Sequence, residues 1–188
     1  MPLNEIEVFA KELATYTVHS QRSHDLIQNL EESLSRQLNR EEFLRVKIQV
    51  TVFISINVVY ILSSFGSRID QGKKNGFLTL YGAETKDLFQ ILGEWSAEDL
   101  KIYESLAENV GKIFKLSMKA KTTPKVIDYE RLWANFAITL LRNLNLGTQI
   151  SVGSVQLTPL ANSVKQNLAT LSNEITKKLG EKLELLKT

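Results

Sequence analysis

The sequence of 188 residues contains no cysteine. This absence excludes a disulfide framework, a thiolate zinc site and a cysteine nucleophile, and nothing in the composition indicates secretion. The first residues, MPLNEIEVFAKEL, carry acidic groups early and lack a basic region followed by an apolar core, so they do not predict a signal peptide. We therefore expect a cytoplasmic protein.

Histidine is almost as scarce, since the chain has only His19 and His24. Residues five positions apart lie on different faces of a helix, so this pair is not expected to hold a metal ion. Gly72-Lys73 resembles part of a phosphate-binding loop, but Lys74 stands where Ser or Thr is needed to hold magnesium. Neither a GxSxG nor a GxGxxG motif is present. We therefore expect a non-enzymatic protein with no catalytic residue, no metal site and no cofactor.

An excess of charge of one sign is also missing. Lys and Arg total 23 against 21 for Asp and Glu, and a net charge of +2 does not by itself predict an anionic partner. The hydrophobic fraction of 43% and the charged fraction of 23% are those of an ordinary globular protein, and the length fits one domain. The sequence therefore predicts a single domain over residues 1–188.

The longest apolar run extends from Lys47 to Phe65 and reads KIQVTVFISINVVYILSSF. Alternation over 48–58 is typical of a strand, but the run is roughly three times the usual strand length of about five to six residues. Its length is near the lower limit for a membrane span, although its polar residues fall on several faces. A helix buried on most sides tolerates a few polar residues that bond to neighbouring helices. We favour the buried helix and keep the strand and membrane insertion through 48–65 as alternatives.

Apolar spacing and capping patterns predict further helices around this run. The segment 66–76 contains three glycines and predicts a flexible loop, and residues 77–81 fit either a short strand or an apolar docking segment. A short β-hairpin is predicted near 150–157. The expected fold is therefore mostly α, a single-domain bundle of about six or seven helices around a buried central helix. The expected helices cover residues 4–18, 26–38, 40–66, 83–93, 96–120, 126–146 and 159–187.

A narrow leucine stripe marks the second of these helices. Leu26, Leu30 and Leu34 recur at four-residue steps with charged residues between them, a pattern suited to a coiled-coil-like contact. We interpret this stripe as a partner-binding seam, so a protein partner or a homo-oligomer is expected.

The strongest chemical signal is a run of five lysines between Gly111 and Lys125 with no acidic residue among them. The first three share a helix face and form a basic ridge that fits contact with a nucleic-acid backbone. For the lysines themselves we favour a solvated helix end whose charges complement the helix dipole, and we keep nucleic-acid contact, and after it contact with an anionic membrane surface, as the functional alternatives. The candidate nucleic-acid-binding residues are Lys112, Lys115, Lys119, Lys121 and Lys125.

These features predict a non-enzymatic helical subunit or scaffold of a larger assembly that contacts a nucleic-acid backbone without reading bases. In size and general chemistry, the chain resembles the small helical subunits of ribonucleoprotein effectors, such as those of CRISPR interference complexes. The rival function is that of a membrane-associated protein inserted through residues 48–65, and the third is that of an enzyme whose acidic residues are dispersed along the sequence.

Overall fold

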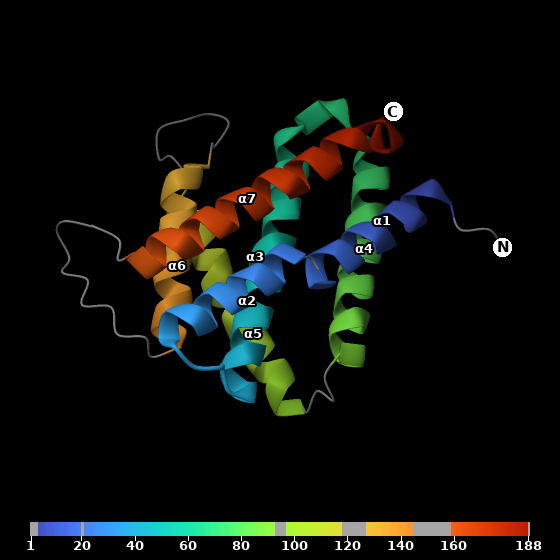
Figure 1. Ribbon diagram of the computed structural model, residues 1–188. Helices are drawn as coiled ribbons and strands as arrows, with labels where there is room; N and C mark the ends of the chain where they lie inside the picture. The colour runs from blue at the N-terminus through green and yellow to red at the C-terminus, as the bar shows by residue number, and fades with distance from the viewer. Residues whose placement is uncertain (1–3, 20, 93–96, 118–126, 145–158, 188) are drawn as a thin grey trace.

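The computed structural model describes residues 4–19, 21–92, 97–117, 127–144 and 159–187 (Figure 1). These residues form helices and no strand, so the fold is a mostly α helical bundle, as predicted. The elements in chain order are α1 (Glu5–His19), α2 (Gln21–Leu34), α3 (Arg40–Ser64), the short 3-10 helix η1 (Gly66–Arg68), α4 (Gln71–Leu92), α5 (Ala97–Leu116), α6 (Tyr129–Asn143), α7 (Pro159–Glu181) and a second 3-10 helix, η2 (Leu183–Leu186).

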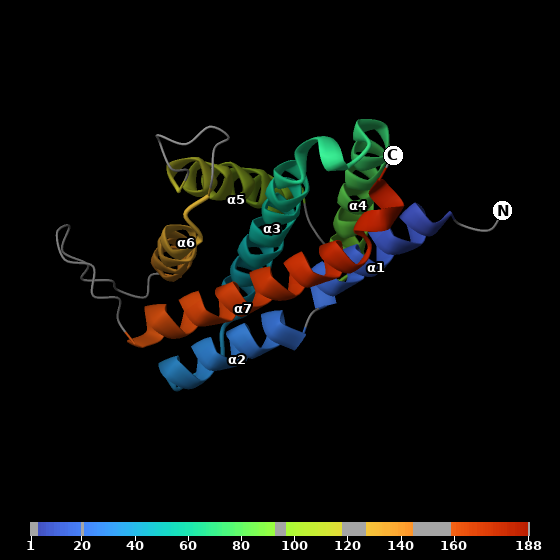
Figure 2. The ribbon, with the colours of Figure 1, turned by 90° about the horizontal axis from the view of Figure 1, so that it is seen from above.

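The helix α3 lies at the centre of the bundle and contacts each of the other α-helices (Figure 2). In this view α5 and α6 lie at one end, α1 and α4 at the other, and α2 runs alongside α7. Phe53, Ile54 and Val58 are fully buried. The longest apolar run therefore forms a buried helix, and the strand alternative is wrong. A helix pairs the backbone hydrogen-bonding groups of so long a segment within the segment itself and lets it bury side chains on most sides.

Two helix starts follow the predicted capping boxes. The side chain of Asn39 accepts the backbone N–H of Glu42, and the Glu42 carboxylate accepts the N–H of Asn39, both at 2.9 Å. Asn4 and Glu7 make the same reciprocal pair at the start of α1. Each pair satisfies backbone donors that a helix leaves open at its N-terminus.

The prediction of a loop over 66–76 is wrong in its second half, because only the first part of this segment connects two helices. The chain turns at Gly66, which has a φ of 56°, and α4 already begins at Gln71. The carboxylate of Asp70 accepts the N–H of Lys73 at 2.7 Å and caps the helix. The later part of the expected loop, the segment 77–81 and the expected helix as far as Leu92 are therefore parts of one long helix, α4.

Packing explains why α4 tolerates its glycines. Phe77 and Tyr81 lie one turn apart and are buried against α1, where the ring of Phe77 stacks on Phe9 with centroids 5.0 Å apart. Burial of large aromatic side chains outweighs the weak helix propensity of glycine, which costs about 1 kcal/mol per residue.

The other helix ends also differ from the expected ones. The helix α5 ends at Leu116 instead of near 120, and α6 starts at Tyr129, where Asp128 caps it, instead of at 126. The predicted C-terminal helix 159–187 ends at Glu181 and continues as η2. There Leu186 is buried, and its carbonyl accepts the N–H of Asp70 at 2.8 Å, which ties η2 to the start of α4. The predicted hairpin near 150–157 lies outside the described residues.

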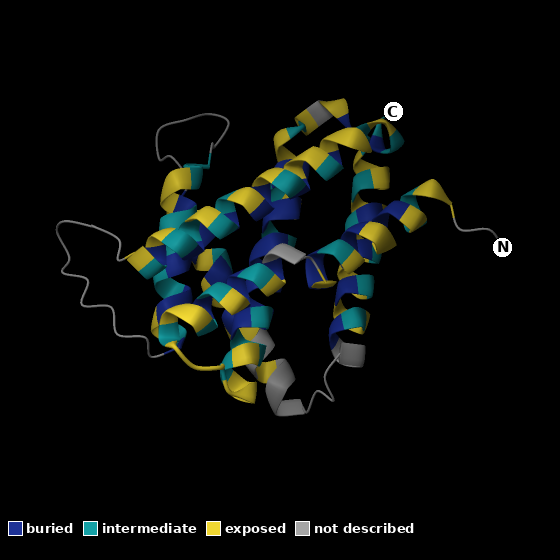
Figure 3. Cartoon of the chain, viewed as in Figure 1, coloured by how far each residue is buried: buried dark blue, intermediate teal, exposed yellow. Residues whose placement is uncertain are grey.

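Burial along the surrounding helices is one-sided. Figure 3 shows buried and exposed positions alternating along α7, where Val164, Leu168 and Leu171 face the core. The buried apolar residues of the described chain form one cluster centred on α3.

Candidate functional site

The helix α5 buries one face and exposes the other. Leu106, Val110, Ile113 and Phe114 are buried, and Phe114 packs on Phe53 of α3 with ring centroids 5.4 Å apart. The opposite face is open to solvent and is called here the outer face of α5. It consists of Glu104, Ser105, Glu108, Asn109, Gly111, Lys112, Lys115 and Leu116.

Two of the predicted nucleic-acid-binding lysines lie on this outer face. Lys112 and Lys115 are exposed, as the helical spacing predicts. Lys119, Lys121 and Lys125 lie outside the described residues. The ridge that the structure describes is therefore its first two lysines.

An acidic residue that the sequence analysis missed lies directly beside the ridge. Glu108 Oε1 and Lys112 Nζ are 2.8 Å apart, with both side chains mostly exposed. The hydrogen bond and the charge of Lys112 lower the pKa of Glu108, and the charge of Lys115 adds to this effect. The sequence does carry a signal for this pair, the four-residue step from Glu108 to Lys112. Glu108 lies just before the lysine run, which begins after Gly111.

The predicted partner-binding seam lies mostly inside the protein. Leu26 and Leu30 are 2% and 0% exposed, Leu34 is half-buried, and α2 packs against α7 of the same chain. A narrow leucine stripe does not distinguish a helix of the same chain from a helix of another one. A separate partner would have to displace α7 to reach Leu26 and Leu30.

A charged groove between α1 and α7 was not predicted. It consists of two adjoining pockets of about 360 and 190 Å³, which share Lys178 and Glu181. Lys178 Nζ lies 4.4 Å from the centre of the Tyr16 ring, and the Tyr16 hydroxyl donates a hydrogen bond to Glu174. Because these groups interact with one another across the two helices, they serve to hold α1 against α7.

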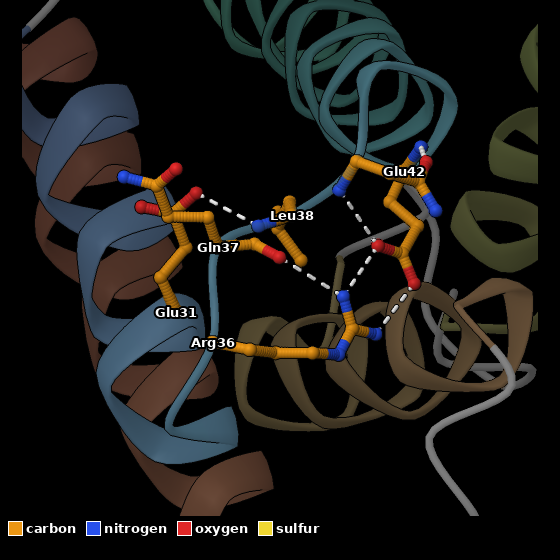
Figure 4. A network of polar contacts seen from close by, with 6 residues as sticks. Glu31, Arg36, Gln37, Leu38 and Glu42 are labelled. Atoms are coloured by element: carbon orange, nitrogen blue, oxygen red, sulfur yellow. Dashed lines mark hydrogen bonds and ion pairs between the residues drawn. The ribbon is translucent and has the colours of Figure 1, made fainter.

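A polar network fixes the connection between α2 and α3 (Figure 4). Arg36 donates two hydrogen bonds to Glu42, at 2.8 and 2.7 Å, and Glu31 accepts the N–H of Leu38 at 2.9 Å. The hydrogen bonds from Arg36, followed by the one from the N–H of Asn39, lower the pKa of Glu42 to about 2. Glu42 also lines a pocket of about 180 Å³ next to Arg45 and Asn143. These hydrogen bonds stabilise the connection between α2 and α3, in which Ser35 adopts a positive φ of 52°.

Asn57 is an exception to the good pairing of buried polar groups. It is fully buried in α3, and neither its side-chain oxygen nor its nitrogen has a hydrogen-bond partner within the described chain. Gln49, two turns earlier, differs because its oxygen accepts a hydrogen bond from Asn143 of α6 at 2.7 Å. Buried polar groups without partners are rare and destabilising, so Asn57 lowers the stability of the core.

The helix α3 is also the one helix in the described part of the chain that is long and apolar enough to cross a membrane. Its most apolar window has a mean hydropathy of 1.7, and 67% of that window is buried inside the protein. Core helices of globular proteins share this combination of length and burial.

Metal ligands do not gather among the residues that the structure describes, where no group of three or more His, Asp or Glu side chains is placed to hold an ion. His19 at the end of α1 and His24 in α2 are both exposed.

Comparison with known protein families, curated proteins and solved structures finds no match to this chain. Its function is therefore inferred from its own geometry.

Proposed function

We propose that the chain is a non-enzymatic helical subunit of a larger cytoplasmic assembly and that it contacts its partner through the outer face of α5. The observation that carries this proposal is the combination of opposite charges with an exposed apolar side chain on one continuous surface. Leu116 is 64% exposed at the end of the face, next to Lys112 and Lys115. Paired charges around an apolar contact are the means by which protein interfaces select and orient their partners.

The rest of the bundle acts as the support for this face. The inner side of α5 is held by aromatic packing on α3, through Phe53 and Tyr60, whose ring stacks on Phe114 with centroids 5.1 Å apart. A surface on a rigid helix presents its groups with less ordering cost than one on a loop, which favours binding.

Purification from the native cell tests this function. The bait is the full chain, compared with a base-reversed variant that carries Lys112→Glu and Lys115→Glu. A matched control reverses two exposed lysines at the end of the chain, Lys177→Glu in α7 with Lys182→Glu directly after that helix. We expect proteins that co-purify with the wild type and with the control to be lost with the base-reversed variant. Equal recovery with all three baits would overturn the role of α5.

Contact with a nucleic-acid backbone is the second candidate, favoured by the exposure of Lys112 and Lys115. Each phosphate contact contributes a slope of about −0.7 for single strands, or −0.9 for duplex DNA, to the dependence of log affinity on log salt. Fluorescence anisotropy with a generic oligonucleotide measures this slope, whose magnitude should fall by about 1.4 for a single strand or about 1.8 for a duplex in the variant Lys112→Gln with Lys115→Gln. An unchanged slope would eliminate these lysines as phosphate contacts.

Membrane insertion through residues 48–65 is the third candidate, favoured by the length and apolarity of α3. It requires the surrounding helices to leave α3, because most of the apolar window is covered by them. Retention of the chain in the membrane fraction after a carbonate wash would support insertion, and recovery in the supernatant would contradict it.

A further inference from the structure

The outer face of α5 is divided along the helix into an acidic half and a basic half. Glu104 and Glu108 occupy the earlier turns, and Lys112 and Lys115 occupy the later ones. All four side chains are exposed. Such an arrangement is complementary to its own reverse, because a helix running in the opposite direction places its basic half against this acidic half.

The spacing sets the position of a symmetry axis. In an antiparallel pair related by a two-fold axis on the outer face, level with position 110 along the helix, Glu108 of one copy lies opposite Lys112 of the other, and Lys112 lies opposite Glu108. Ser105 then lies opposite Lys115, and Glu104 lies opposite Leu116. The two existing ion pairs between Glu108 and Lys112 become one network of four alternating charges, since the same residues meet in both directions.

We propose that a second copy of this chain docks antiparallel on the outer face of α5 and forms a symmetric dimer in which the acidic half of each copy lies against the basic half of the other, with Glu108 directly opposite Lys112. This inference rests on the proposed function, because it names the partner of the same surface. Opposite charges across the contact fix its register, and the parallel arrangement is disfavoured because it places like charges together.

Gly111 supports a close contact at the axis. It lies inside α5, where glycine is a poor helix former, and a Cβ added to it would meet nothing within 4 Å. Among the residues that the structure describes, no neighbouring atom therefore requires glycine at this position. A second helix packed here favours a small residue, because small residues let two helix backbones approach closely.

Leu116 gives a second reason for a protein contact. Its side chain is 64% exposed in the monomer, and the antiparallel pair covers it with the aliphatic part of the opposite Glu104. Burial of apolar area at both ends of the contact adds to the charge pairing at its centre.

The acidic half distinguishes this partner from a nucleic acid. A polyanion laid along the outer face would meet Glu104 and Glu108 within the same stripe as the lysines. Lys101 is the one exposed cation before the acidic half in the described part of α5. Equal numbers of acids and bases over Glu104 to Lys115 favour self-pairing.

A contact between single helices is smaller than the roughly 1,200 Å² that stable interfaces bury, so we expect a weak dimer. Sedimentation velocity of the full chain over about 1 to 300 µM should show a monomer at the low end and a dimer at the high end. Raising the ionic strength should shift the equilibrium toward monomer, because exposed charge pairs are screened. A wild-type chain that stays monomeric throughout this range would overturn the proposal.

Charge reversal tests which residues make the contact. The base-reversed variant defined above and an acid-reversed variant, Glu104→Lys with Glu108→Lys, should each weaken self-association by about tenfold or more. An equimolar mixture of the two should restore a dimer, because one face is then wholly basic and the other wholly acidic. The α7 control variant should dimerise as the wild type does. Dimerisation of either reversed variant alone, or no dimer in the mixture, would overturn the proposal.

A single thiol tests the register without altering charge. The chain has no cysteine, so Asn109→Cys introduces one reactive group beside the axis. Under mild oxidation this variant should form a disulfide-linked dimer at a rate that depends on the wild-type charges, whereas Thr79→Cys on α4 should not. Equal crosslinking at both positions would contradict the register.

These outcomes separate the dimer from the wider function. If the chain remains monomeric but its co-purifying proteins are lost with the base-reversed variant, the outer face of α5 binds a different protein and self-docking is wrong. If the dimer forms but co-purification is insensitive to the reversal, self-docking stands and the assembly contact lies elsewhere. Circular dichroism of each variant confirms that the fold is kept.

Discussion

The helices α3 and α5 pack directly on each other, yet they differ in what lies on their remaining faces. The helix α3 meets other helices on most sides and buries most of the apolar residues from Val46 to Leu62, with Val59 the exposed exception. The helix α5 meets them on one side and leaves the acidic and basic residues of its outer face in solvent. The residues of α3 are therefore constrained by packing, whereas the outer residues of α5 are available for binding a partner. Substitutions in the two helices should separate the effect on stability from the effect on binding.

The largest effect is expected for a charge placed in α3. Ile54 is fully buried, so Ile54→Asp should cost several kcal/mol, a large part of a total stability of about 5 to 15 kcal/mol. Lys115→Asp on the exposed face of α5 is the matched control and should leave the free energy of unfolding within about 0.5 kcal/mol of the wild type. Urea unfolding followed by circular dichroism measures both. Cooperative unfolding of Ile54→Asp near the wild-type midpoint would show that α3 is not buried.

The next effect has the opposite sign. Asn57→Leu replaces a buried amide without partners by an apolar side chain of similar size, and it should raise the free energy of unfolding by about 1 to 2 kcal/mol. Gln49→Leu is the control, because it removes an acceptor that Asn143 uses and should therefore destabilise the protein. Thermal unfolding of both variants gives the comparison. Destabilisation by Asn57→Leu would mean that this amide has a partner, such as a buried water molecule.

The sequence predicted the starts of α1 and α3 well and the extent of α4 poorly. A capping box is a local signal, since the residues that bond at a helix start lie three positions apart. The course of 66–76 depends on remote contacts instead, because the burial of Phe77 and Tyr81 against α1 keeps a glycine-containing segment helical. Local propensity alone predicts a loop there.

The candidate site was predicted only in part, for a related reason. The positions of Lys112 and Lys115 on one exposed face follow from helical spacing, as the structure confirms. Whether Leu26 and Leu30 face the core or a partner depends on where α7 lies, which a pattern within α2 does not contain. The ion pair of Glu108 with Lys112 could have been predicted from the sequence, because a Glu four residues before a Lys on a helix predicts such a pair.

A smaller effect should separate two glycines. Gly111→Ala adds a Cβ into open space within α5 and should stabilise the monomer by about 0.5 to 1 kcal/mol. Gly66→Ala also meets no atom, but its φ of 56° is unfavourable for alanine, so it should cost about 1 kcal/mol. Unfolding at low protein concentration keeps any dimer out of the measurement. Equal effects of the two substitutions would contradict the backbone conformation at Gly66.

The smallest effect concerns the ion pair between Glu108 and Lys112 in the isolated chain. Because both side chains are mostly exposed, a double-mutant cycle with Glu108→Gln and Lys112→Gln should give only a small favourable coupling in dilute solution. Lys112 lowers the pKa of Glu108, so the coupling should be present at neutral pH and be lost as the pH falls through the folded-state pKa of Glu108.

Protein concentration turns this small coupling into a test of what the outer face of α5 is for. In a dimer each of these residues meets two opposite charges in place of one, so the coupling measured at high concentration should exceed the value in dilute solution. High salt, with a screening length of about 3 Å at 1 M, should reduce both values. A coupling that stays the same from low to high protein concentration would place Glu108 and Lys112 outside any contact between copies and leave them as a solvated pair.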